Sequence, residues 1–426
     1  MLAIMLIIAT LLLLSGVPIF VAFSIGGFMW CMMYLGLPFE SVAEIFFNSI
    51  NKYTLLAVPL FMLSGSLMGE TGVTSALLGF TNAIFGRIRG ILGVSLIWSC
   101  ALMGAMTGSS VATVTTMMES MVPVMEKYGY PKKYSCGILG TSGHLAALIP
   151  PSTNAVIFGY ITEMSVGKLF MAGLFPGIAG AIILSLTAVG IARHRNLGAL
   201  PLPLTRHERL LGLLKVLPAM VIIGVVLGSI YLGILVPTEA GLVACFITVL
   251  IGQIFYRRLN FSDLLGSVGR SLAGAANVYL LIASSSLLGY LLVYLQIPQS
   301  FTNAMLSIGM GYWGFIFIAI LIFLVLGTAL DPAVCTIVAV PIMMPTVNAL
   351  NMDPYVFYIL ENCIVGVAQV TPPDAVVLYT MSSMAKLDIW TILKECWPYV
   401  LTGSILLVIV VVLFPPLANF IPNLMR

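Results

Sequence analysis

Two short stretches decide the fold of this chain: Ile149-Pro-Pro-Ser-Thr-Asn154 and Thr371-Pro-Pro-Asp374. Each interrupts a long apolar run with paired prolines and polar residues. Proline lacks a backbone hydrogen-bond donor, so carbonyl oxygens of the preceding turn are left without a partner. Both runs are therefore predicted to be discontinuous helices, at 134–161 and 356–384. Their recurrence at a separation of about 220 residues indicates an internal repeat.

The composition is that of an integral membrane protein. Of the 426 residues, 60% are hydrophobic and 8% are charged, whereas a soluble globular chain carries about 25% charged residues. Apolar runs of roughly 20 residues, enough for a helix to cross a ~30 Å hydrocarbon core, recur along the whole chain. We expect about ten crossings, at 2–15, 17–36, 54–70, 134–161, 169–192, 214–233, 238–255, 271–295, 356–384 and 397–416. The seven scattered cysteines are expected to be apolar packing residues.

Two further apolar stretches, 91–126 and 313–349, are predicted to be re-entrant hairpins. Each is too long for one crossing and is interrupted near its middle, at Thr107-Gly-Ser-Ser110 and Gly327-Thr-Ala-Leu-Asp-Pro332. If 91–126 enters and leaves on one face, all Lys and Arg except Lys52, Lys168 and Arg426 lie on the cytoplasmic side, as the positive-inside rule requires. The absence of Lys and Arg between residues 296 and 355 suits a second hairpin that opens on the opposite face.

The predicted fold is an all-α membrane protein of two inverted repeats. Each repeat has an odd number of crossings, so the second must be inverted, as in secondary transporters whose sites lie near the midplane. A short amphipathic segment precedes each hairpin, at 73–88 and 297–308. The first repeat spans 1–200, with scaffold helices within 1–70, the hairpin 91–126 and the broken helix 134–161. The second spans 201–426, with scaffold helices within 214–295, the hairpin 313–349 and the broken helix 356–384.

The two hairpin tips and the two helix breaks are expected to converge inside the protein. Freed carbonyls and the oxygens of Ser, Thr, Asn and Asp suit a hard cation such as Na⁺. The N-termini of half-helices, with their open N–H groups, suit an anionic substrate. The alternative is that the prolines only kink packed helices, which four breaks in symmetric positions disfavour.

Asp331 and Asp374 are the acidic residues at these breaks, and intramembrane carboxylates are functional by default. Each could complete a Na⁺ site or carry a proton, and the alternative is a carboxylate that caps the following helix. His144, one to two turns before Pro150, could relay a proton or contact substrate, although a packing role is favoured. Glu119 and Glu361 are expected to have interfacial or structural roles.

Several runs along the whole chain carry a family resemblance. Residues 55–61 read LLAVPLF, 168–173 read KLFMAG ahead of a Pro-Gly pair, and 237–240 read PTEA. With the two Pro-Pro breaks and the final Phe414-Pro415, they resemble the large membrane subunit of tripartite ATP-independent periplasmic (TRAP) transporters. The resemblance implies a Na⁺-driven importer of organic anions in the bacterial inner membrane that works by an elevator motion. It also implies two partners: a periplasmic substrate-binding protein and a small four-helix membrane subunit.

Site residues follow from the resemblance by position. One Na⁺ region would contain Gly108, Ser109, Ser110, Thr153 and Asn154, and the other Gly327, Thr328, Asp331, Thr371 and Asp374. Substrate contacts are expected from Thr113, Ser152, His144 and Asp374. The chain departs from the family twice: Thr113 stands where a carboxylate usually follows the first tip, and Asp374 replaces an apolar residue. We therefore expect one neutral and one acidic ion region.

Other functions remain open at this point. A stand-alone symporter driven by Na⁺ or H⁺ would need no binding protein. An intramembrane enzyme would need a nucleophile–base pair or a metal-ligand cluster, and the sequence suggests neither. A channel is disfavoured by two opposed hairpins with closed tips. We expect no cofactor besides the coupling ion, no nucleic-acid partner, and a carboxylate cargo (C4-dicarboxylate, sialic acid or keto acid) or a small sulfonate.

The substitution Asp374→Asn tests whether the aspartate at this position, where the family has an apolar residue, acts in transport. It is expected to reduce Na⁺-dependent uptake in reconstituted vesicles without unfolding the protein, because it removes a charge from the acidic ion region. Unchanged uptake with unchanged Na⁺ dependence would exclude Asp374 from the mechanism.

Overall fold

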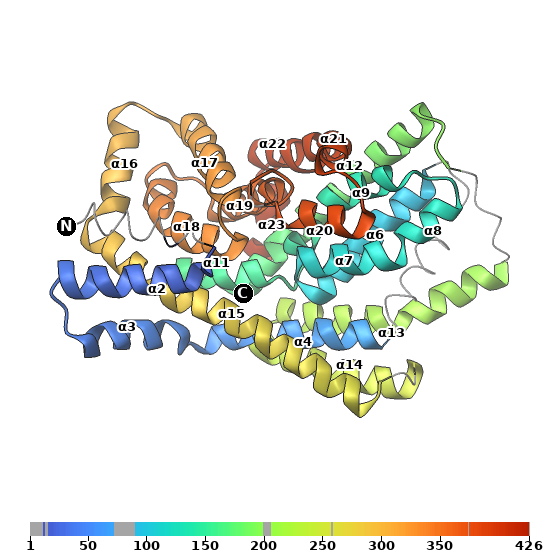
Figure 1. The fold of residues 1–426 in the computed structure, drawn as a ribbon, viewed down its shortest axis with the longest axis horizontal. Helices are drawn as coiled ribbons and strands as arrows, with labels where there is room; N and C mark the ends of the chain where they lie inside the picture. The colour runs from blue at the N-terminus through green and yellow to red at the C-terminus, as the bar shows by residue number, and fades with distance from the viewer. Residues whose placement is uncertain are drawn as a thin grey trace.

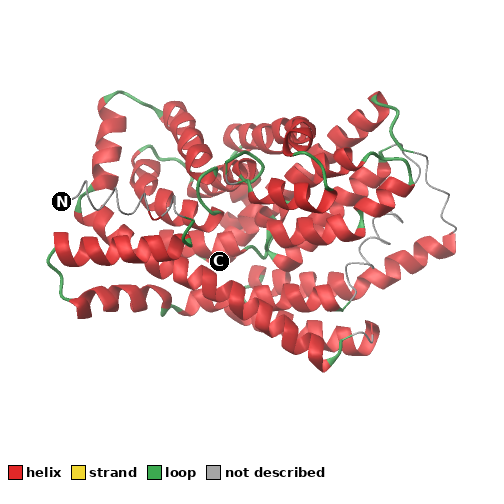
Figure 2. Cartoon of the chain, viewed as in Figure 1, coloured by secondary structure: helices red, strands yellow, loops and turns green. Residues whose placement is uncertain are grey.

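The computed structural model describes residues 12, 16–71, 90–198, 206–256, 259–373 and 375–425, and the regular elements in these ranges are helices (Figures 1 and 2). They form two layers. In the lower layer of Figure 1, α15 runs across α2, α3 and α4 and contacts all three. This layer contains α2 (Ile19–Met29), α3 (Phe39–Ile50), α4 (Ala57–Glu70), α13 (Arg206–Tyr231), α14 (Pro237–Ile251) and α15 (Phe261–Tyr294).

The other layer holds the hairpins and the discontinuous helices of both repeats. Both proline pairs, Pro150–Pro151 and Pro372–Pro373, are joined by a cis peptide bond. The first repeat supplies α6 (Ile91–Thr107), α7 (Ser110–Ser120), α8 (Val122–Lys127), α9 (Lys132–Ser142), α10 (Leu145–Leu148), α11 (Thr153–Thr162) and α12 (Val166–His194). The second supplies α16 (Ile297–Ser307), α17 (Tyr312–Gly327), α18 (Pro332–Ala349), α19 (Pro354–Ala368), α20 (Val376–Ala385), α21 (Ile389–Tyr399), α22 (Leu406–Leu413) and α23 (Pro416–Leu424).

The predicted order of elements is confirmed in the described residues. Every predicted crossing from residue 17 onward coincides with a helix or a helix pair, and the amphipathic segment at 297–308 is α16. Six helices are long and apolar enough to cross a membrane, or seven when the pair Lys132–Leu148 and Thr153–Thr162, bent by 48°, counts as one. The predicted crossing 2–15 (residue 12 apart) and the amphipathic segment 73–88 lie outside the described residues.

The structure differs from the sequence prediction at several helix ends. α15 begins at Phe261 and α21 at Ile389, ahead of the predicted 271 and 397. Capping explains both: the Asn260 N–H donates to Asp263, and the Asp388 carboxylate accepts from the N–H groups of Trp390 and Thr391. Polar caps extend a helix beyond its apolar run. Helix α3 was not predicted, because its two glutamates interrupt a run that is in any case too short to cross.

Each hairpin is closed at its base. The Gly90 N–H, just before α6, donates to the Tyr130 hydroxyl just after α8, at 3.0 Å. In the second repeat, the hydroxyls of Thr302 on α16 and Thr346 near the end of α18 are 2.8 Å apart. Residues 91–126 therefore begin and end close together, as a hairpin requires, and α18 ends beside α16, the helix that precedes the second hairpin.

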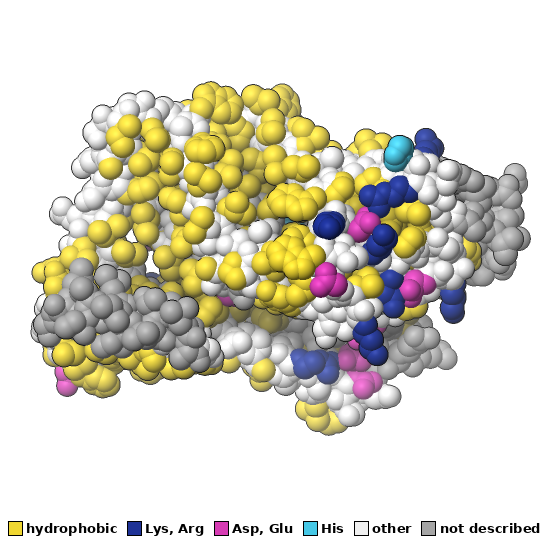
Figure 3. Space-filling model, turned by 45° about the horizontal axis from the view of Figure 1, so that its top comes forward, with side chains coloured by type: hydrophobic (Ala, Val, Ile, Leu, Met, Phe, Trp, Pro, Cys, Tyr) yellow, Lys and Arg dark blue, Asp and Glu magenta, His cyan; other side chains and the backbone are white. Residues whose placement is uncertain are grey.

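The basic loops of the first repeat gather at one end of the molecule. Lys133 and Arg195 both pair with Glu395, at 3.7 and 2.6 Å, so the start of α9 and the end of α12 lie together. Figure 3 shows Lys and Arg side chains clustered toward one end of a face that is otherwise largely hydrophobic. This distribution fits the charge asymmetry from which the topology was predicted.

The first helix break packs closely on α12. A Cβ atom at Gly173 would lie 2.1 Å from the carbonyl oxygen of Leu148, the last residue of α10. Only a residue without a side chain permits this approach. The glycine in the KLFMAG run therefore holds the broken helix against its neighbour.

The substitution Gly173→Ala tests this packing. The added methyl group must displace the backbone of α10, and overpacking costs about 1–3 kcal/mol, so we expect a lower melting temperature of the protein in detergent. Gly190→Ala on the same helix is the control, because a Cβ there meets no atom within 4 Å and Ala favours helix. Equal melting temperatures for the two variants would contradict this account.

Candidate functional site

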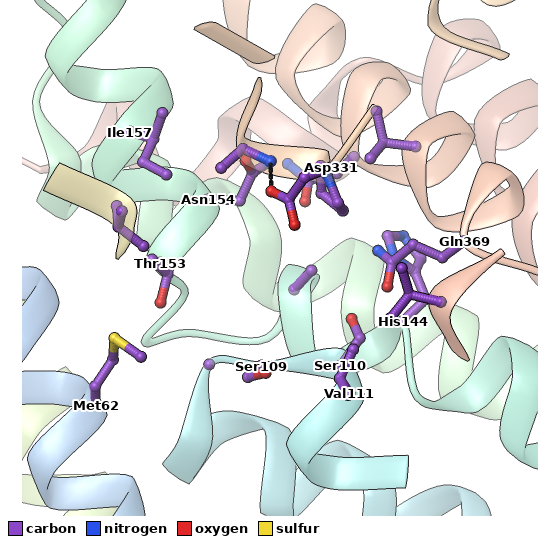
Figure 4. Close-up of a pocket in the computed structure, with 18 residues that line it drawn as sticks. Met62, Ser109, Ser110, Val111, His144, Thr153, Asn154, Ile157, Asp331 and Gln369 are labelled. Atoms are coloured by element: carbon purple, nitrogen blue, oxygen red, sulfur yellow. Dashed lines mark hydrogen bonds between the residues drawn. The ribbon is translucent and has the colours of Figure 1, made fainter. Parts of the chain in front are cut away.

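A cavity of about 210 Å³ lies where the two hairpins and the two broken helices meet (Figure 4). The scaffold layer also contributes to its wall, through Met62 of α4 and Val278 of α15. The cavity thus lies at the boundary between the two layers. Its polar lining residues are Ser109, Ser110, His144, Thr153, Asn154, Asp331, Asn362 and Gln369.

The tip of the first hairpin rests on the first helix break. Gly108 has a φ of +60°, in the left-handed region, and a Cβ there would lie 3.2 Å from the carbonyl oxygen of Pro151. The tip therefore ends inside the protein, where a non-helical backbone is tolerated. All five residues of the predicted neutral ion region line the cavity.

Three helix N-termini surround this cavity. The hydroxyl of Ser109 accepts from the Ala112 N–H at the start of α7, and that of Ser152 accepts from the Ala155 N–H at the start of α11, both at 3.4 Å. The Asp331 carboxylate accepts from the Ala333 N–H at 2.9 Å at the start of α18. Helix N-termini carry partial positive charge, so the cavity wall is electropositive there without any basic side chain.

Asp331 shares the cavity with the neutral group instead of forming a separate region. Figure 4 shows it facing Asn154 and Thr153 across the cavity. Among the other predicted residues of the acidic region, Gly327, Thr328 and Thr371 do not line this cavity. The hydroxyls of Thr328 and Thr371 donate to carbonyls of their own helices, and Asp374 lies outside the described residues.

Of the residues predicted to contact substrate, some line the cavity and others do not. His144 lines the cavity, whereas Thr113 and Ser152 are buried beside it and do not. The His144 ring packs against Gly366, where a Cβ would lie 2.1 Å from Nδ1. Gly366 follows His144 by the same 222 residues that separate Pro372 from Pro150, so the two occupy equivalent positions in the repeats.

A buried carboxylate lies behind the cavity. Glu361 of α19 is fully buried. The amides of Asn154 and Asn362 donate to its Oε2 at 3.1 and 3.2 Å, and the Thr336 hydroxyl lies 2.5 Å from its Oε1. Of the two roles predicted for Glu361, interfacial or structural, the structure favours the structural one, because the buried carboxylate joins α11, α18 and α19.

Two further polar residues of the cavity wall, Asn362 and Gln369, were not predicted. Glu361 and Asn362 lie in the middle of α19, and Gln369 follows its last residue, before the second break. The adjacent polar pair Glu361-Asn362 inside an otherwise apolar run was the available signal.

The oxygens that face the cavity are hydroxyl and amide groups and one carboxylate. In the part of the chain that the structure describes, no three His, Cys, Asp or Glu side chains come together as metal ligands. The seven cysteines are buried and free, as predicted. Such a wall can bind a small polar solute reversibly by hydrogen bonds and helix N-termini.

Comparison with known proteins identifies the family. The model of the tripartite ATP-independent periplasmic transporter, DctM component, matches residues 6–417. The chain belongs to the DctM family. It is 31% identical over 384 residues to the C4-dicarboxylate TRAP transporter large permease protein of Pseudomonas aeruginosa, which covers 90% of each chain. It is 30% identical to the ectoine TRAP transporter large permease protein of Halomonas elongata over 97% of each chain.

Solved structures agree on the fold. The Alcanivorax borkumensis YdaH transporter superposes with a TM-score of 0.62 at 14% identity, over 91% of this chain and 90% of that one. The DctM family is a family of transporter permeases, so this chain is a multi-pass membrane transport protein and not an enzyme.

The substitution Thr336→Val tests the hydrogen bonds to Glu361. It keeps the shape of the side chain but removes a hydrogen-bond partner from a buried carboxylate, which costs about 1–3 kcal/mol; we expect a lower melting temperature. The control is Thr380→Val, because that hydroxyl only donates to the Val376 carbonyl of its own helix. A Thr336→Val protein as stable as the control would show that the hydroxyl contributes nothing.

Proposed function

We propose that this chain is the permease subunit of a secondary transporter that imports a small organic anion together with Na⁺ into a bacterial cell. The observation that carries the proposal is the cavity in which a hairpin tip, a helix break and Asp331 meet. Sites of secondary transporters occur where discontinuous helices of both repeats converge. The chain would lie in the inner membrane.

The coupling ion is proposed to bind at the first tip and break. Ser109, Ser110, Thr153 and Asn154 bring hydroxyl and amide oxygens to one cavity, and Asp331 adds a negative charge. Oxygen donors of this kind suit a hard cation. Binding of Na⁺ would offset the charge of Asp331 and of an anionic cargo together, which couples the two.

The motion is proposed to be of the elevator type. The hairpins and broken helices share one layer, and the scaffold helices share the other. The cavity lies between the layers, with Met62 and Val278 as scaffold contacts. Sliding of one layer against the other would carry the cavity from one face of the membrane to the other.

The proposed partners are a periplasmic substrate-binding protein and a small membrane subunit. Relatives are named as large permease proteins of TRAP transporters, which supports a complex of several chains. Related TRAP permeases are named for C4-dicarboxylate, ectoine, isethionate and sialic acid. A small organic acid is therefore the proposed cargo class.

Reconstitution tests the proposal. The chain is inserted into vesicles with its small membrane subunit, and the binding protein encoded by the neighbouring genes is added with its ligand. We expect accumulation when Na⁺ is higher outside and none when K⁺ replaces Na⁺. Equal uptake in K⁺ would contradict Na⁺ coupling, and uptake without the binding protein would favour a stand-alone symporter.

In the same assay, Asp331→Asn is expected to lower the apparent Na⁺ affinity by about tenfold, the equivalent of about 1.4 kcal/mol. The control is Asp353→Asn. Asp353 likewise precedes a proline and caps its helix, α19, by accepting from the Tyr355 N–H at 2.8 Å, but it does not line the cavity. An unchanged Na⁺ affinity in Asp331→Asn would remove Asp331 from the ion site.

A further inference from the structure

Two buried side chains that line the cavity have polar atoms without a hydrogen-bond partner among the described residues. They are both ring nitrogens of His144 and the Oδ1 atom of Asn362. Their residues are only 5% and 1% exposed. Buried polar atoms in native proteins are almost always matched. His144 Nδ1 faces Gly366, so His144 Nε2 and the Asn362 oxygen are the atoms that a ligand or ordered water could match.

The orientation of the Asn362 amide is fixed by its neighbours. Its Nδ2 atom donates to the Tyr358 carbonyl oxygen at 3.3 Å and to Glu361 Oε2 at 3.2 Å. Both neighbours are acceptors, so only the NH₂ group can face them. The amide oxygen is therefore the atom of this side chain that has no hydrogen-bond partner among the described residues.

Glu361 orients a second amide in the same way. Asn154 donates to its Oε2, while the Asn154 Oδ1 lies 3.0 Å from the Thr336 hydroxyl. Asn154 and Asn362 both line the cavity. Glu361 is thus a positioning residue, which acts on the cavity through two amides without lining it.

The charged groups of the cavity wall limit which ligands can bind. Among the described lining residues there is no Lys or Arg, and Asp331 is the one acidic side chain. A neutral imidazole offers one donor and one acceptor. The acceptors in the wall that have no hydrogen-bond partner among the described residues are the Asn362 oxygen and one nitrogen of His144.

We propose that the cargo carries a hydrogen-bond donor group besides its acid group, and that Asn362 Oδ1, held in place by Glu361, receives that donor. The donor is a hydroxyl, ammonium or amidinium group. A plain dicarboxylate would leave the Asn362 oxygen without a hydrogen-bond donor, whereas a hydroxy acid or a zwitterion can supply one. This inference rests on the proposed transport function and names its substrate class.

The test uses matched probes on the purified complex of the chain with its small membrane subunit. Succinate, malate and aspartate share one skeleton and differ by hydrogen, hydroxyl and ammonium; propionate, lactate and alanine form a second such series. In Na⁺ buffer, we expect the hydroxyl or ammonium member of a series to raise the melting temperature more than the bare acid. Equal shifts within both series, zero included, or a larger shift with the bare acid would overturn the proposal.

Single substitutions then test whether Asn362 and Glu361 cause the preference among the probes. Asn362→Leu removes the acceptor and is expected to weaken binding of the preferred probe at least tenfold while the bare acid binds as before. Glu361→Gln can present an NH₂ group to Asn362, which allows that amide to turn and face the cavity with its own NH₂. We expect the preference to shift toward the bare acid in this variant, a change that mere loss of stability does not produce. Asn348→Leu, at an exposed position on α18, is the matched control.

The outcomes separate the two proposals. A wild-type complex that shows no Na⁺-driven uptake contradicts the proposed function, whatever its probe preference. A complex that transports with Na⁺ but prefers bare acids overturns only the inference about Asn362. Asn362→Leu protein that keeps the wild-type preference also overturns it.

Discussion

The hydrogen-bonding demand of the backbone is the constraint on which this structure depends. In hydrocarbon every N–H and C=O group must find a partner inside the protein, yet four segments of this chain leave the helical path. Three of those segments, the two hairpin tips and the first helix break, meet at one cavity. Ser109, Ser152 and Asp331 each cap the helix that resumes after a break. The cavity is what remains between the capped ends, so the same hydrogen bonds that make the breaks tolerable also aim three helix N-termini at one place.

The buried carboxylate of Glu361 fixes the positions of the side chains around it. Removing a charge from water costs several kcal/mol unless hydrogen bonds compensate, and here two amides and a hydroxyl do so. These donors belong to α11, α18 and α19, which come from both repeats. The hydrogen bonds therefore tie the inner arm of the second hairpin to the first broken helix. They also leave the cavity-facing amides with little freedom to rotate.

The sequence predicted the breaks and the hairpins because proline pairs and charge asymmetry act locally and strongly. It located the first-repeat residues of the cavity well, from Gly108 to Asn154. It did not predict that Asp331 would join them, because repeat symmetry alone does not say how close the two tips lie. Asn362 and Gln369 were not predicted, and Glu361 was given no part near the cavity, because the sequence does not show which side of α19 packs against α11 and α18. Helix α3 was missed because it is too short to cross.

The contact between His144 and Gly366 has a consequence for the ancestry of the chain. These residues are equivalent in the two repeats and touch each other, with the imidazole occupying the space where a second side chain would stand. Two identical halves could not reproduce this arrangement: two imidazoles would compete for one space, and two glycines would leave it empty. The halves are complementary at this contact and not interchangeable, so only one of the two equivalent positions can hold the histidine.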